Sequence, residues 1–124
     1  MKKISLSEGE WKLMNLLWDR NPRTVGEMTS FLKADTGWTK ATVNVMLNRL
    51  AEKEAVRIEK GEKVKLVYPI ATREEAVVQE AVSTLGKIRT DSIALLISTM
   101  AKESKLSAEE IDELLNVLKE AKHD

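Results

Sequence analysis

The chain has 124 residues, 43% of them hydrophobic and 32% charged, and its 20 basic side chains are balanced by 20 acidic ones. It has no cysteine, and its one histidine is the penultimate residue, which excludes a disulfide framework, a thiolate metal site and a Cys/His or Ser/His/Asp catalytic constellation. The sequence contains no run of about 18 apolar residues, so we expect no transmembrane span. We therefore expect a globular protein with no metal, no cofactor and no enzymatic activity.

Charge is unevenly distributed along the chain. Residues 1–70 hold 13 Lys and Arg against 9 Asp and Glu, whereas residues 71–124 hold 7 against 11. A basic first half is expected if only that half contacts phosphate, although chance scatter of surface charge is the alternative. The N-terminus has no apolar core of a secretory signal, and the lack of cysteine is compatible with a cytoplasmic location, which we expect.

Two capping boxes open the first two expected helices. In each, a hydroxyl side chain precedes a glutamate by three positions, at Ser7 to Glu10 and at Thr24 to Glu27. The first of these helices carries an apolar stripe and ends before Pro22. Trp11 and Trp18 lie seven residues apart on that stripe, so we expect them to pack in the core rather than to stack on bases.

A third helix is expected to begin after Thr39, whose hydroxyl can cap it. Apolar residues at i, i+3, i+4 and i+7 predict one inward face. These residues are Val43, Met46, Leu47 and Leu50. The opposite face carries mostly side chains that can form hydrogen bonds, namely Lys40, Thr42, Asn44, Val45, Asn48 and Arg49.

A tight hairpin follows this helix, with a charged turn at residues 60–63. Its largely alternating apolar set is Val56, Ile58, Val64, Leu66 and Tyr68. Three short helices followed by a basic hairpin are typical of a winged helix-turn-helix, and that fold points to duplex DNA. We expect the third helix to contact base edges and the hairpin lysines to contact phosphates, while for any single residue a solvated surface role is the alternative. The predicted DNA-contacting residues are Lys40, Thr42, Asn44, Val45, Arg49, Lys60, Lys63 and Lys65.

Residues 71–124 are expected to form a second domain of three helices. The apolar run Ile93–Ile97 needs burial on every side. Residues 71–124 are too few to enclose a good core alone, and we therefore expect two copies to pack together. The alternative is that these helices pack onto their own N-terminal domain. The expected interface residues are Ile93, Leu96, Ile97, Leu114, Leu115 and Leu118. The predicted fold class is mainly α with a small β-hairpin: a winged helix-turn-helix at residues 1–70 and a C-terminal three-helix dimerisation domain.

The segments Glu10–Trp18, Trp38–Leu50 and Leu106–Leu118 resemble the BlaI/MecI/CopY family of bacterial transcriptional repressors. The resemblance covers essentially the whole chain. It implies a homodimer of winged helices on operators with TACA and TGTA half-sites. For the β-lactam branch it implies control of antibiotic-resistance genes and inactivation by a membrane-bound sensor protease that cleaves the C-terminal domain. For the copper branch it implies a cysteine-rich metal motif.

Three departures from this family pattern matter. The chain has no cysteine, so thiolate copper sensing is excluded. The Ser-Pro-Lys-Thr run of the β-lactam branch corresponds to Thr39–Thr42, where Ala41 replaces the lysine, so operator preference is expected to differ. The candidate cleavage site by position is Thr99 and Met100, which does not match the Asn-Phe pair of that branch and argues against cleavage there.

The sequence thus predicts a cytoplasmic homodimeric transcriptional repressor that blocks polymerase at a palindromic operator. Its expected partners are a double-stranded DNA operator, a second copy of the chain and, by resemblance, the sensor protease, with no membrane insertion of its own. Two alternatives are open. One is a repressor released by a small ligand at the dimer interface, and the other is a winged-helix protein-interaction module without DNA binding.

Overall fold

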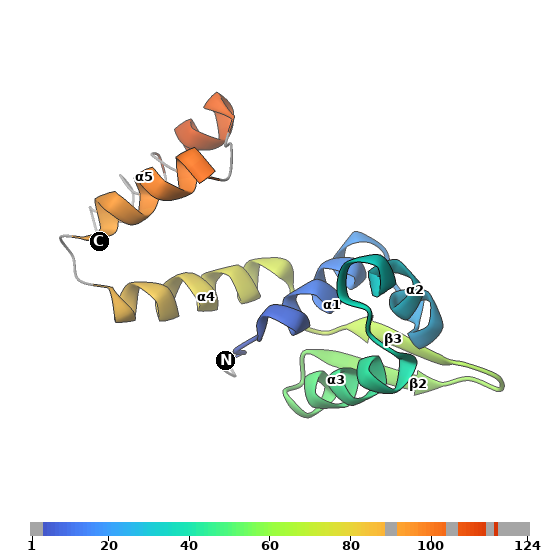
Figure 1. The fold of residues 1–124 in the computed structure, drawn as a ribbon. Coiled ribbons are helices and arrows are strands. Elements are labelled where there is room, and N and C mark those ends of the chain that lie inside the picture. Colours follow the sequence, from blue (N-terminus) through green and yellow to red (C-terminus); the bar gives the residue numbers. More distant parts are fainter. Residues whose placement is uncertain (1–3, 89–91, 104–106, 114–115, 117–124) are drawn as a thin grey trace. The chain divides into compact units, whose positions relative to one another are not determined.

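The computed structural model describes residues 4–88, 92–103, 107–113 and 116 (Figure 1). The chain divides into two compact units, Met1–Val82 and Ser83–Asp124, and each is described by itself. The predicted domain boundary between residues 70 and 71 stays a prediction. The first unit nevertheless extends past it and takes in the start of a helix that the sequence assigns to the second domain.

The first unit combines helices with a small antiparallel sheet, which confirms the predicted fold class (Figure 1). In chain order its elements are α1 (Glu8–Asp19), β1 (Arg23–Thr24), α2 (Val25–Thr36), α3 (Lys40–Glu52), β2 (Val56–Lys60), β3 (Lys65–Pro69) and the start of α4 (Arg73–Lys87). Strand β1 was not predicted. It pairs with β3, so that the strand order is β1-β3-β2.

Local capping chemistry sets the helix starts, as predicted. The Ser7 amide donates to Glu10 Oε1 at 2.8 Å, and the Glu10 amide donates to Ser7 Oγ at 3.2 Å. The same reciprocal pair opens α2 at Thr24 and Glu27. Thr39 Oγ1 accepts the Thr42 amide at 3.2 Å and so begins α3. Satisfying these orphan amides determines where each helix begins.

The core of the first unit gathers apolar side chains from its helices, from β2 and β3, and from the segments that connect them. Two core residues, Ala71 and Ala76, lie beyond residue 70, where the sequence predicts the winged helix to end. Their exposed fractions are 3% and 1%. The first turn of α4 therefore packs into this core. The largest fully buried side chains are Leu13, Met14, Leu17, Met28, Val43, Leu47, Leu50, Val56 and Val67.

The pairing of β2 with β3 differs from the alternation read in the sequence. Ile58 pairs with Val67, and side chains of directly paired residues share a face of the sheet. Val67 is therefore the residue of β3 that the core encloses, although the predicted apolar set omits it. Val64, which that set includes, is exposed in the turn. A Cβ atom at Gly61 would lie 2.8 Å from the Val64 carbonyl oxygen, so only glycine fits this turn without a shift.

The second unit contains α5 (Ile93–Glu103) and a helical segment at residues 108–113. Ser107 and Glu110 form the predicted capping pair of that segment. None of the residues of α5 is buried, and Leu95 is 69% exposed. Leu114, Leu115 and Leu118 lie outside the described residues. Among the helices that the structure describes, none is long and apolar enough to cross a membrane.

Candidate nucleic-acid interface

A cleft lies where the first turn of α2, the start of α3 and the hairpin meet. Its volume is about 290 Å³. Four of the predicted DNA-contacting residues line it, two from α3 and two from the hairpin, although more than 20 positions separate Asn44 from Lys65 in the sequence. The lining residues are Lys40, Asn44, Lys63, Val64 and Lys65, with Thr24, Val25 and Gly26 from the other wall.

The other four predicted residues lie outside this lining, and all are solvent-exposed. The Thr42 hydroxyl lies 3.2 Å from that of the capping residue Thr39. Val45 and Arg49 follow on α3, and Val45 is among the large apolar side chains that water reaches. Lys60 ends β2 and pairs in register with Lys65. The structure thus brings Lys60 beside the cleft lysines, whereas Arg49 lies in the last turn of α3.

The basic side chains around the cleft have no carboxylate partner in the part of the chain that the structure describes. Across residues 4–88, 92–103 and 107–113, no carboxylate forms an ion pair with Lys40, Arg49, Lys60, Lys63 or Lys65. Other basic residues of the same unit do have carboxylate partners, namely Lys12 with Asp35, Arg20 with Glu27, Arg23 with Asp19, Lys53 with Glu10 and Arg57 with Glu59. Cations without partners can take up phosphates and release counterions without first breaking an internal pair.

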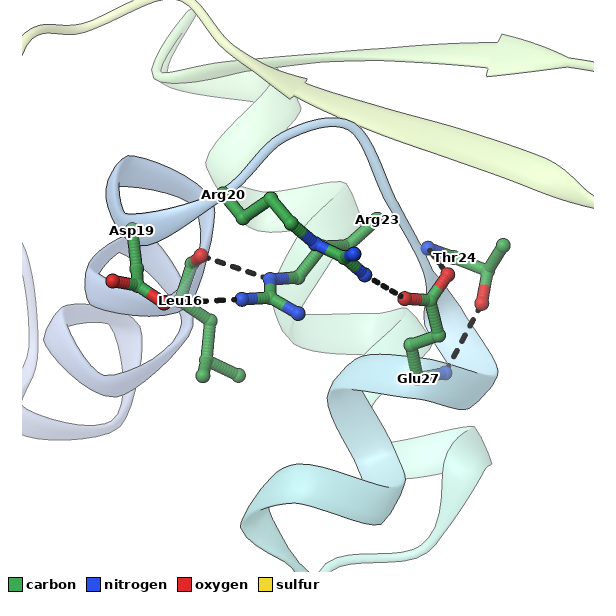
Figure 2. A network of polar contacts seen from close by, with 6 residues as sticks. All are labelled: Leu16, Asp19, Arg20, Arg23, Thr24 and Glu27. Carbon is green, nitrogen blue, oxygen red and sulfur yellow. Dashed lines mark hydrogen bonds and ion pairs between the residues drawn. The ribbon is translucent and has the colours of Figure 1, made fainter.

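A polar network holds the α2 wall of the cleft against α1 (Figure 2). The buried Arg23 donates from Nε to the Leu16 carbonyl oxygen at 2.9 Å, and its Nη2 lies 3.4 Å from Asp19 Oδ2. Arg20 Nη2 lies 3.1 Å from Glu27 Oε2. The hydrogen bond from the Thr24 amide is the main cause that holds the pKa of Glu27 below its ordinary value. The network fixes the first turn of α2 where the hairpin passes it.

Sequence reasoning did not include this wall in the predicted interface. The capping box at Thr24 predicts where α2 starts, but nothing local shows that this turn lies beside the hairpin. The turn reaches the hairpin because Arg23 pairs with Val67 and Thr24 pairs with Leu66. That pairing joins residues more than 40 positions apart, so neither composition nor periodicity reports it.

Close packing of α1 on α3 supports the opposite side of the cleft. A Cβ atom at Gly9 would lie 2.6 Å from Met46 Cε and 3.1 Å from the Trp38 ring. The glycine therefore allows the two helices to approach closely at the N-terminal end of α1. The helix that carries Lys40 and Asn44 is therefore supported by a second helix, and such support helps to hold a binding constellation in place.

The fold is a winged helix with a three-stranded sheet, and its third helix and hairpin share a cleft lined by lysines that have no carboxylate partner among the described residues. These features define the class of winged-helix DNA-binding proteins. Within that class, the sequence matches the family described as Penicillinase repressor over residues 6–120, and the chain belongs to this family. This confirms the resemblance drawn from the sequence. The chain is a DNA-binding transcriptional repressor and, like the members of its family, not an enzyme.

Known relatives span nearly the whole chain. The penicillinase repressor of Bacillus licheniformis is 27% identical over 124 residues, covering 99% of this chain and 97% of that protein. The methicillin resistance regulatory protein MecI of Staphylococcus aureus strain N315 is 21% identical over 117 residues, covering 94% and 95%. The solution structure of the DNA-binding domain of the repressor BlaI superposes with a TM-score of 0.54 at 28% identity, over 60% of this chain and 93% of that one.

Proposed function

We propose that the chain represses transcription as a homodimer on a palindromic operator, with the start of α3 of each protomer in the major groove. The observation that carries the proposal is the cleft, in which Lys40 and Asn44 of α3 lie with Lys63 and Lys65 of the hairpin. A side chain that reads a base and side chains that neutralise phosphates are thereby held together. These side chains match a groove edge of a duplex, where base edges lie beside backbone phosphates.

The roles divide by chemistry. The Asn44 carboxamide can donate one hydrogen bond to an adenine edge and accept another from it. The methyl groups of Thr42 and Val45 can contact a thymine methyl. Phosphates are assigned to the basic residues Lys40, Arg49, Lys60, Lys63 and Lys65, which have no carboxylate partner in the described chain. Phosphate contacts supply affinity and register, whereas the contacts of Thr42, Asn44 and Val45 supply sequence preference.

Dimerisation is proposed through the C-terminal helices. Ile93, Leu96 and Ile97 are only half-buried within one chain, and Leu95 is exposed. Full burial of such a side chain contributes about 1.5–3 kcal/mol, so a second copy that covers α5 would gain several times this amount. Leu114, Leu115 and Leu118 complete the proposed interface, as the sequence predicts. A two-fold dimer reads a palindrome because each subunit meets the same half-site.

The genes under control are proposed from the relatives, which are named for penicillinase and for methicillin resistance. We assign to this chain, acting in the cytoplasm, the control of antibiotic-resistance genes. Release by a membrane-bound sensor protease is the corresponding proposal. Thr99 and Met100, both exposed on α5, are the site that position suggests, although cleavage of a helix requires local unwinding. A sensor-protease gene beside the chain's own gene would support this route, whereas a transporter or redox gene there would favour another inducing signal.

The decisive experiment measures binding of the full-length protein to duplex DNA from upstream of its own gene. We expect a protected segment with two symmetric half-sites whose centres lie about 10 base pairs, or a multiple of this, apart. In a gel-shift assay, the Lys40→Ala, Lys63→Ala double variant should no longer retard the duplex. Wild-type binding should survive an excess of scrambled competitor duplex. Equal affinity for the upstream duplex and for its scrambled version would contradict an operator-specific repressor.

A further inference from the structure

Trp18 joins α1 to the segment that begins α4. Its indole Nε1 donates to the carbonyl oxygen of Ala71 at 2.9 Å, across 53 positions of sequence. Ala71 lies between the end of β3 and the start of α4 and is buried. The Trp18 ring packs against the core, as the sequence predicts, and lies edge-on to Trp11 with 5.8 Å between ring centroids. Its polar edge nevertheless serves a different purpose, because it holds the connection to α4.

Other contacts hold the same segment on the winged helix. The amides of Ile70 and Ala71 both donate to the Ala55 carbonyl oxygen, at 2.8 and 3.1 Å. The methyl group of Ala76 is enclosed by the core. The Arg73 guanidinium carbon lies 5.9 Å from the centroid of the Trp18 ring, at the outer limit of a cation–π contact. We call residues 70–76, so held, the α4 anchor.

Beyond the anchor, α4 leaves the core. Ala76 is the buried residue of this helix, whereas the large apolar side chains that follow are exposed, namely Val77, Val78, Val82 and Leu85. Residues 77–87 extend the helix by roughly 16 Å at 1.5 Å per residue. The anchor therefore holds the first turn of α4 on the winged helix.

We infer that Trp18 is a positioning residue that sets the operator spacing accepted by the dimer, by fixing the direction in which α4 leaves the winged helix. This inference rests on the proposed homodimer. Because α4 is long, a small tilt at the anchor gives a large displacement at the far end of the helix. A tilt of about 12° moves the far end of a 16 Å lever by about 3.4 Å, which is the rise of one base pair. Two linked half-sites are occupied together only when the linkage matches their separation.

The test compares Trp18→Phe with wild-type protein on operators whose half-sites are moved apart or together by one and two base pairs. Trp18→Phe keeps an aromatic ring and removes the N–H donor. We expect the ratio of affinities between the best spacing and its neighbours to fall at least threefold, with the dimer intact by sedimentation. The matched control is Trp11→Phe, which makes the same substitution in the same helix at a residue that does not donate to Ala71, and it should keep the wild-type ratio.

The outcomes separate the inference from the proposed function. General loss of stability weakens binding at every spacing by one factor, so it leaves the ratio unchanged. A dimeric Trp18→Phe protein with the wild-type ratio overturns the positioning role alone. A wild-type protein that is monomeric, or indifferent to spacing, overturns the proposed dimer and this inference with it. If Trp18→Phe does not fold, Ala76→Gly loosens the same anchor and should lower the ratio. The matched control Ala34→Gly, at an exposed position of α2, should keep the wild-type ratio.

Discussion

Lys53 Nζ lies 2.6 Å from Glu10 Oε1 and 2.7 Å from the carbonyl oxygen of Ser5. Lys53 caps the C-terminal end of α3, and Glu10, only 3% exposed, lies in the first turn of α1. The pair therefore ties the end of α3 to the N-terminal segment. Glu10 Oε2 is buried without a hydrogen-bond partner in the described chain, so this carboxylate depends on Lys53 and Ser7 for compensation.

Lys53→Met should destabilise the winged helix, because it leaves the Glu10 carboxylate buried without its cation. The expected loss in the free energy of unfolding is about 1–3 kcal/mol. The lower part of that range applies because the Lys53 side chain is 36% exposed and water screens the pair. Urea denaturation followed by circular dichroism measures it. Lys12→Met, which removes a lysine paired with the exposed Asp35, should leave the midpoint nearly unchanged. Equal midpoints for the two variants would show that the pair of Lys53 and Glu10 does not stabilise the winged helix.

The same carboxylate predicts a pH dependence of stability. Burial by itself raises the pKa of Glu10, but the hydrogen bonds from Lys53 and Ser7, with the charge of Lys53, outweigh it and hold the pKa below the ordinary 4.5. A carboxyl whose pKa is depressed by folding stabilises the protein above its unfolded pKa and loses that contribution as pH falls through the folded pKa. Thermal melts should show wild type more stable than Glu10→Gln at pH 7. The difference should shrink below about pH 4.5. A constant difference down to pH 3 would contradict this linkage.

Lys63→Ala should reduce the salt dependence of operator binding. In a plot of log K against log salt concentration, each lost phosphate contact lowers the slope by about one, hence about two for a dimer. Anisotropy titrations between about 50 and 200 mM salt measure the slope. Lys12→Ala makes the same change in net charge at a lysine paired with Asp35 and should keep the wild-type slope. If both variants behave alike, only net charge matters and the hairpin makes no specific phosphate contact.

Asn44→Ala should relax the preference for one base in each half-site, at a cost of about 1–3 kcal/mol per half-site. Stability should barely change, because Asn44 lines the cleft while Val43 and Leu47 of the same helix are the buried residues. Binding to a library of single-base operator variants reports the change. Asn48→Ala removes the same group from an exposed position of α3 outside the cleft lining and should keep the base profile. An unaltered profile for Asn44→Ala would move base reading to Thr42 or Lys40.

Leu96→Asp should dissociate the proposed dimer, because it places an unpaired charge in an apolar contact, twice in a symmetric assembly. Sedimentation at micromolar concentration should show monomers, and operator affinity should fall because the half-sites are no longer linked. Ser98→Asp adds the same charge at an exposed position of α5 and should remain dimeric. A Leu96→Asp monomer that still binds the operator at wild-type strength would end the dimer proposal.

Much of the architecture could be predicted from the sequence, because it depends on residues a few positions apart. The capping pairs at Ser7 and Thr24 place the starts of α1 and α2, and both are confirmed. The spacing of Val43, Leu47 and Leu50 predicts the buried face of α3, and all three side chains are enclosed. The residues expected on its outer face follow by elimination, so most of the candidate interface could be named without coordinates.

Long-range pairing decided the rest. Strand β1 has two residues and no strand signal of its own, and it exists because Arg23 pairs with Val67. The same register buries Val67 and makes the first turn of α2 a wall of the cleft. The hydrogen bond from Trp18 to Ala71, which holds the segment before α4 on the winged helix, spans 53 positions. Helical periodicity and capping act within about one turn and are written in neighbouring residues. The partners of a strand or of an indole N–H are chosen only when the chain closes on itself, so the tertiary structure alone determines them.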